Sequence, residues 1–175
     1  MREVRAGRTG ALATLFERHH ARLYRFCLRM TGNRQIAEDL VQDVFMRILK
    51  YRTSYKDEVE FAPWMFRIAR NACADHLRRD AHEAPLSDER MDEHEANAAA
   101  GEPAGDGRAE LVRRALLALP ADRREVLVLS RYEFKSYEEI ARTLGCSVGA
   151  VKVRVHRAIK ELRRIYLELA QEVCT

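Results

Sequence analysis

The sequence has no long hydrophobic run. None of its apolar stretches approaches the roughly 18 residues that a membrane-spanning helix needs. The first ten residues contain arginines but lack the apolar segment of a signal peptide. We therefore expect neither a membrane span nor secretion, and we predict a cytoplasmic protein.

Cysteine is scarce and scattered. The four cysteines, at positions 27, 73, 146 and 174, include no C-x-x-C pair and do not cluster with histidines at zinc-site spacing. The motifs H-E-x-x-H and G-x-x-x-x-G-K-[ST] are also missing. The His19-His20 pair has no third ligand nearby and is interpreted as part of a helix face. We expect no metal, no disulfide and no cofactor, and a nucleic-acid enzyme is disfavoured.

Positive charge is concentrated toward both ends of the chain. Residues 1–80 carry 16 Lys and Arg against 10 Asp and Glu, residues 81–108 carry 2 against 8, and residues 109–175 carry 13 against 9, for a net charge of +4. Lys and Arg that neutralise phosphates supply most of the non-specific affinity for nucleic acids. Two basic segments around an acidic one thus indicate two modules that face a polyanion.

Residues 81–108 have the composition of a linker. They contain two prolines, three glycines, many acidic residues and almost no large apolar side chains. Burial of such a segment cannot offset the entropy lost on ordering it. We predict an all-α fold of two small helical domains, residues 1–80 and 109–175, joined by a flexible acidic linker.

In the first segment, apolar residues recur at helical spacing. The sequence Thr31-Gly32-Asn33 interrupts the pattern and predicts the turn of a helical hairpin, with Asn33 as the N-cap of the second helix. A third helix is expected to begin around Pro63, which suits a first helical turn, and to run to Arg79.

The second segment contains the pattern of a helix-turn-helix. Ser136 and Glu139 form a capping box at the start of a short helix. Gly145 is expected to end that helix in the left-handed conformation, and Ser147 can cap the next one. A turn of about three residues between two such helices is typical of this DNA-binding motif. The residues of the second helix predicted to pack inward are Val148, Val151, Val155, Ile159 and Leu162.

The other face of this second helix is basic, and its first residues are small. Small side chains at that end allow a helix to approach base edges in the major groove. The residues that we expect to cap the helix, read the bases or contact phosphates are Ser147, Gly149, Ala150, Lys152, Arg154, His156 and Arg157.

Three segments, in this order along the chain, resemble extracytoplasmic-function (ECF) sigma factors of the sigma-70 family. They are 37–45 (AEDLVQDVF), 61–79 (FAPWMFRIARNACADHLRR) and the stretch from Leu119-Pro120 through the helix-turn-helix. The resemblance extends from Leu12 to Arg164. It implies a protein that binds core RNA polymerase, at the clamp of the β′ subunit and the β flap, and directs it to promoter DNA.

The resemblance also implies a role for each segment. The first would bind the clamp through Asp39, Gln42 and Asp43. The third would read the minus-35 element, although this chain has Ala150 and Val153 where the family often has hydroxyl side chains, so its contacts are expected to differ. The second, with the loop of residues 51–60, would bind and melt the minus-10 element through Trp64, Arg67, Arg70, Asn71, Arg78 and Arg79. For Trp64, packing in the core is an equal alternative.

Two further points concern partners. A helix-turn-helix regulator that binds duplex DNA without polymerase is the main alternative, and it would require a ligand pocket or a dimer interface within residues 1–80. The sequence there instead suggests a basic helix beside an acidic and polar one. The resemblance further implies control by an anti-sigma factor, because such proteins commonly bind between the two domains of the family.

Overall fold

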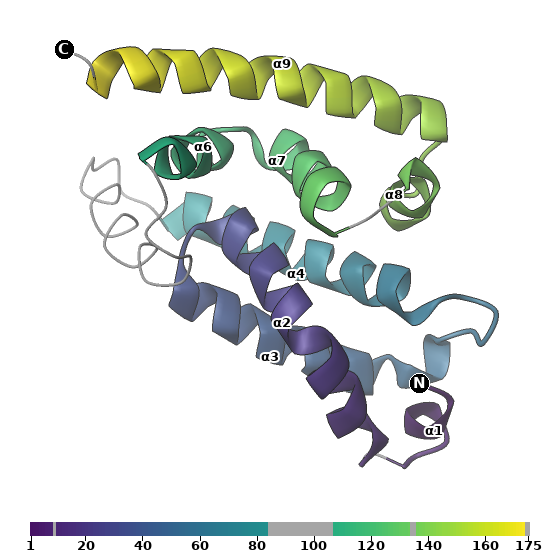
Figure 1. Cartoon of the computed structure of the whole chain (residues 1–175). Coiled ribbons are helices and arrows are strands. Elements are labelled where there is room, and N and C mark those ends of the chain that lie inside the picture. The colour runs from purple at the N-terminus through teal and green to yellow at the C-terminus, as the bar shows by residue number, and fades with distance from the viewer. Residues whose placement is uncertain (9, 84–106, 134–135, 174–175) are drawn as a thin grey trace.

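The structure is a computed structural model that describes residues 1–8, 10–83, 107–133 and 136–173. Every element in these ranges is helical, which confirms the prediction of an all-α fold (Figure 1). Within the same ranges, no helix combines the length and the apolar character needed to cross a membrane.

The helices form two groups, which we name by their order in the chain. The first helical group consists of α1 (Arg2–Arg5), α2 (Ala11–Thr31), α3 (Arg34–Lys50), the 3-10 turn η1 (Arg52–Ser54) and α4 (Phe61–Glu83). The second helical group consists of α6 (Gly107–Leu117), α7 (Ala121–Val128), the π-helical turn η2 (Leu129–Glu133), α8 (Tyr137–Leu144) and α9 (Val148–Val173).

The predicted linker, residues 81–108, is described only at its ends. Residues 81–83 belong to α4 and residues 107–108 belong to α6. The rest of the predicted linker lies outside the described residues. Helix α4 also begins two residues earlier than the sequence suggested, at Phe61, so that Pro63 lies within its first turn, where it costs no hydrogen bond.

The turn between α2 and α3 follows the local sequence. Gly32 adopts the left-handed conformation, with φ of 73°, and its amide donates to the carbonyl of Leu28 at 2.7 Å. The Asn33 side chain accepts a hydrogen bond of 3.2 Å from the amide of Ile36. The predicted hairpin and its cap are therefore confirmed, and the core of the group includes an edge-to-face contact between Phe26 and Phe66.

The helix-turn-helix is also present as predicted. The Ser136 hydroxyl accepts from the amide of Glu139 at 3.2 Å, and the Glu139 carboxylate accepts from the amide of Ser136 at 3.3 Å. Gly145 ends α8 with φ of 65°. The Ser147 hydroxyl then accepts from the amide of Ala150 at 3.2 Å and caps α9.

Loss of the capping box is expected to destabilise the second helical group. Ser136→Ala removes the acceptor for the Glu139 amide and should lower the free energy of unfolding by about 1 kcal/mol. Urea unfolding followed by circular dichroism measures the change. Ser54→Ala is the control, since the Ser54 hydroxyl is exposed and only donates to the carbonyl of Tyr51. Equal stability of both variants would show that the cap does not hold α8.

One prediction about α9 was wrong. Val151 and Val155 are buried as expected, but Ile159 is 37% exposed and Ala158 is buried in its place. The inward stripe continues by three residues from Val155 to Ala158 rather than by four. The small Ala158 side chain lets α9 lie close to α6 and α7, which it contacts.

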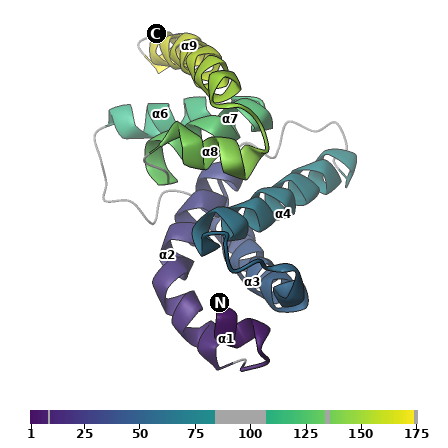
Figure 2. The same cartoon turned by 90° about the vertical axis from the view of Figure 1, so that its right-hand side faces the viewer.

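The two helical groups pack directly on each other. Helix α2 contacts α6, α7 and η2, and α4 contacts α8. Figures 1 and 2 show the second helical group over α2 and α4, with α9 on the far side and α3 on the opposite side. An added Cβ at Gly32 would lie only 2.7 Å from a methyl group of Leu117. The Leu117 side chain, at the end of α6, therefore packs directly against the backbone of the turn between α2 and α3.

Candidate nucleic-acid interface

The polar face of α3 is largely open to solvent. Asp39 and Gln42 are exposed, one turn apart on the same face. Asp43 is half-buried, and its carboxylate lies 2.9 Å from Nε of Arg47, so it is less available to a partner. The same face continues to Met46, which is 64% exposed. Its exposure could not be predicted, because an apolar residue in an amphipathic helix is usually assigned to the core.

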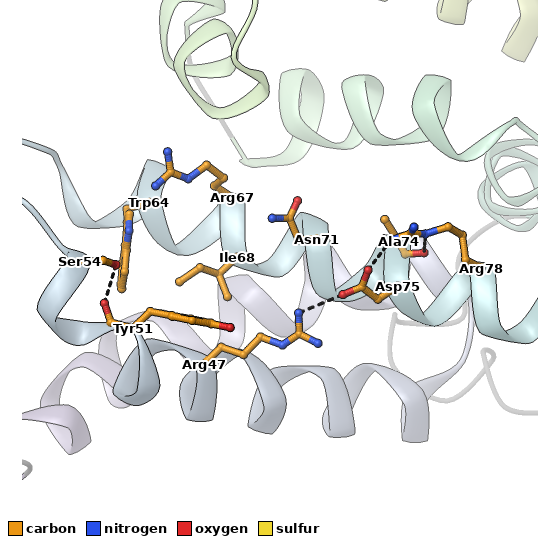
Figure 3. A pocket seen from close by; sticks show the side chains of 10 residues that line it. All are labelled: Arg47, Tyr51, Ser54, Trp64, Arg67, Ile68, Asn71, Ala74, Asp75 and Arg78. Carbon is orange, nitrogen blue, oxygen red and sulfur yellow. Dashed lines mark hydrogen bonds and ion pairs between the residues drawn. The ribbon is translucent and has the colours of Figure 1, made fainter.

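A cavity of about 480 Å³ lies between α3 and α4. Figure 3 shows Arg47 reaching from α3 toward Asp75 on α4, where its Nη1 donates at 3.2 Å. This hydrogen bond and the nearby charge of Arg78 lower the pKa of Asp75. The cavity is lined by Arg47, Tyr51, Ser54, Trp64, Arg67, Ile68, Asn71, Ala74, Asp75 and Arg78.

Helix α4 places the six residues predicted to bind the minus-10 element in different environments. Trp64 is only 5% exposed, and its ring packs edge-on against Tyr55, so its position matches the core alternative, with an edge at the cavity. Arg70 is half-buried. The exposed members of the set are Arg67, Asn71, Arg78 and Arg79.

A second cavity of about 480 Å³ lies beside the loop of residues 51–60. The loop is held in part by Tyr55, whose hydroxyl donates to the carbonyl of Val59 at 2.5 Å. Most of the lining comes from this loop and from the first turns of α4, and one residue comes from α8. The lining residues are Ser54, Lys56, Glu58, Val59, Glu60, Pro63, Trp64, Arg67 and Arg142.

Helix α1 supports the same loop and was not predicted. Val4 is buried, and the guanidinium groups of Arg2 and Arg5 lie 3.7 and 3.5 Å from the carboxylate of Asp57. These ion pairs are exposed and contribute little stability each. No helical pattern is recognisable there, because one apolar residue among charged ones forms no amphipathic stripe.

The start of α9 carries the residues that are predicted to bind the minus-35 element. Ser147, Gly149 and Lys152 are exposed, and Ala150 is half-buried. The basic residues that follow, Arg154, His156 and Arg157, are exposed too, and Val153 is exposed among them. The structure therefore brings the predicted minus-35 residues together on one open face of one helix.

Arg70 differs from the other arginines of α4, since it contacts the second helical group. Its Nε lies 3.1 Å from Oε1 of Glu125 on α7, and its Nη1 donates to the carbonyl of Thr143 on α8 at 3.4 Å. Burial of Glu125 outweighs the attraction of Arg70 and raises the pKa of Glu125 to about 7.

Comparison with known proteins identifies the family. Residues 15–83 match the family described as Sigma-70 region 2, and residues 109–162 match Sigma-70, region 4. The chain is 37% identical over 173 residues to the RNA polymerase sigma factor CarQ of Myxococcus xanthus, with 99% of each chain covered. It is 32% identical to the ECF RNA polymerase sigma factor SigM of Bacillus subtilis, over 82% of this chain and 88% of that one. The chain belongs to the ECF RNA polymerase sigma factors.

Similar solved structures agree with this family. One is the sigma factor RpoE in complex with the anti-sigma factor NepR from Bartonella quintana, with a TM-score of 0.69, 27% identity, and coverage of 87% of this chain and 94% of that chain. Another is CnrH in complex with the cytosolic domain of CnrY, also with a TM-score of 0.69, at 25% identity and with 94% and 92% of the two chains covered. The resemblance to ECF sigma factors is thus confirmed.

Proposed function

We propose that this sigma factor binds core RNA polymerase through α3 and directs initiation by recognising minus-10 and minus-35 promoter elements with α4 and α9. The observation that carries the proposal is the separation of three exposed faces with different chemistry. The face of α3 is polar and acidic, that of α4 is basic beside two cavities, and that of α9 is basic at a capped helix start. The protein acts in the cytoplasm and is itself no enzyme.

At the minus-10 element, α4 would hold a melted strand. Arginines such as Arg67 and Arg78 supply phosphate contacts, which are largely independent of sequence. A base that leaves the stack needs a cavity with polar and aromatic walls. The loop of residues 51–60, with the edge of Trp64, forms a cavity of this kind. We assign base capture to this cavity.

At the minus-35 element, α9 would enter the major groove with its first turns. Gly149 and Ala150 allow close approach, and Lys152 and Arg157 are long enough to reach base edges or phosphates. Val153 is exposed at a position where the family often has a hydroxyl group. It offers an apolar contact, such as one with a thymine methyl group, in place of a hydrogen bond.

The two DNA surfaces would act together. Two weak sites on one chain gain affinity because the second site binds at a high effective concentration once the first is bound. Polymerase holds both helical groups near the promoter, so neither surface needs to bind DNA tightly alone. We infer that the free protein recognises promoters poorly.

We also propose control by an anti-sigma factor. The sigma factor would bind polymerase, at the clamp of the β′ subunit and at the β flap, only after its release from that partner. The structurally similar sigma factor RpoE was solved in complex with the anti-sigma factor NepR. Recovery of this chain from its source cells with polymerase subunits alone would count against this control.

Alanine substitutions on α9 test the minus-35 surface. Lys152→Ala or Arg157→Ala should weaken binding of the upstream element by about 1–3 kcal/mol if the lost contact is to a base. If the contact is to a phosphate, the slope of the logarithm of the binding constant against the logarithm of the salt concentration should become shallower by about one. Fluorescence anisotropy with duplex promoter DNA measures both. Arg163→Ala, an exposed position further along α9, is the control. Unchanged binding in both test variants would remove α9 as the recognition helix.

A further inference from the structure

The loop of residues 51–60 has little hydrophobic core of its own. Among these residues, all of which the structure describes, only Tyr55 is buried. Its ring packs edge-on against Trp64, with 5.1 Å between the ring centroids, and lies 6.4 Å from the ring of Phe61. A segment with so few buried contacts opens easily unless its surroundings hold it. The shape of the cavity to which we assign base capture, called the base cavity below, therefore depends on the neighbours of this loop.

Helix α1 lies against the side of the loop that faces away from α4. It contacts η1, with which the loop begins, and it also contacts α2 (Figure 1). Val4 anchors α1, because its side chain is completely buried. A cavity of about 390 Å³ between α1 and the loop is lined by Met1, Arg2, Glu3, Tyr55, Asp57 and Phe61. Tyr55 thus lies between α1 on one side and the first turns of α4 on the other.

Asp57 joins the loop to α1 beside the base cavity. Its carboxylate lies 3.7 Å from Nε of Arg2 and 3.5 Å from Nη1 of Arg5. Lys56 and Glu58, its two neighbours in sequence, line the base cavity, whereas Asp57 lines the cavity beside α1. The contact of Asp57 with α1 therefore determines where the two adjacent residues of the base cavity lie.

We propose that α1 is a positioning element for base capture, which holds the loop through Tyr55 and Asp57 in the shape that accepts a base from the melted strand. This inference rests on the proposed function of the base cavity. Two exposed ion pairs add little to the stability of the fold. A loop with few buried contacts has conformations of similar energy, however, so a small bias decides how often the competent one is populated. Loss of α1 contacts should therefore impair base selection more than folding.

Charge reversal at Asp57 tests whether α1 holds the loop. Asp57→Arg places a third cation beside Arg2 and Arg5 and should detach the loop from α1. Trp64 is the only tryptophan of the sequence, and it is buried against Tyr55, so its fluorescence reports the position of the loop. In the free full-length chain, its emission should shift to longer wavelength and its quenching by acrylamide should increase. Glu172→Arg, with the same charge change at an exposed position of α9, should match the wild type.

Two further variants test whether the effect passes through α1. Arg5→Asp combined with Asp57→Arg exchanges the two charges and keeps the net charge, so the emission of Trp64 should return toward that of the wild type. Val4→Ala removes buried contacts of α1 and changes neither the loop nor any charge. It should shift the emission in the same direction as Asp57→Arg. If the charge exchange restores nothing, Asp57 does not act through α1, and the proposal is overturned.

Promoter opening with core polymerase tests the consequence for base selection. On a promoter found by run-off transcription, permanganate reactivity of unpaired thymines measures opening. The wild type should open this promoter about tenfold better than one with a substitution at the captured minus-10 base. For Asp57→Arg and Val4→Ala this ratio should fall to about twofold, because the competent conformation of the loop is less populated.

A substitution in the minus-35 element is the internal control, since its effect should have the same size in every variant. A protein that is only less stable would lose the same factor at all promoters and keep both ratios. Variants with unchanged Trp64 emission would show that α1 does not hold the loop. A shifted emission with the tenfold ratio retained would overturn the positioning role. Failure of the wild-type chain to open any promoter would instead reject the proposed sigma function, and with it base capture by the loop.

Discussion

Alanine at both Asp39 and Gln42 is expected to abolish capture of core RNA polymerase by this protein. Both side chains are exposed on the polar face of α3, so neither is needed in the core. Central residues of an interface each contribute about 2 kcal/mol or more, so loss of both should weaken binding on the order of a thousandfold. Co-purification of the tagged variant with core polymerase measures the loss.

The control for this experiment is a double variant with the same change in charge, Gln171→Ala with Glu172→Ala, at exposed positions of α9. It should capture polymerase like the wild type. The Asp39 and Gln42 variant should keep its helical content in circular dichroism. Retained capture would place the polymerase contact elsewhere, and loss of helicity would mean that the two side chains are structural.

Glu125→Gln is expected to gain stability relative to the wild type as the pH rises from 5 to 8. Burial raises the pKa of Glu125 to about 7, whereas a solvated glutamate titrates near 4.5. The native state thus favours the protonated carboxyl. The stability that protonation provides is complete below about pH 4.5 and is lost as the pH rises through 7.

The size of this effect follows from the pKa difference. Ionisation of Glu125 should lower the free energy of unfolding on the order of 2 kcal/mol between pH 5 and pH 8. Glutamine does not ionise, so the variant should keep this stability. The difference in free energy of unfolding between variant and wild type should therefore grow with pH by that amount. Urea unfolding at both pH values measures it.

Glu110→Gln serves as the control for the pH experiment. The hydrogen bond from Arg113 lowers the pKa of Glu110, so its contribution changes only below about pH 4.5. The difference between this variant and the wild type should stay constant from pH 5 to pH 8. The same constant difference for Glu125→Gln would contradict the burial of the Glu125 carboxyl between α7, α9 and α4.

Local features of the fold could be predicted from the sequence because they depend on a few neighbouring residues. Asn33, Ser136 and Ser147 cap helices through bonds to amides three residues away. Gly32 and Gly145 adopt left-handed conformations at helix ends, where a side chain would be strained. The same caps position the first turns of α9, so the proposed minus-35 surface could be placed before the structure.

Features that depend on distant residues could not be predicted in this way. No periodicity links Arg70 to Glu125, so this ion pair between α4 and α7 becomes visible only when the two helical groups are packed. Likewise, the burial of Trp64 depends on Tyr55 in the preceding loop. The error at Ile159 arose because helical spacing permits either three or four residues, and packing against α6 and α7 decides between them.

Run-off transcription with core polymerase, this protein and a library of genomic promoters tests the central claim most directly. We expect discrete start sites that share two spaced upstream elements, and we expect them to disappear with the Asp39 and Gln42 variant. Binding of duplex DNA by the free protein, without any new start site in the presence of polymerase, would contradict promoter-directed initiation by this chain.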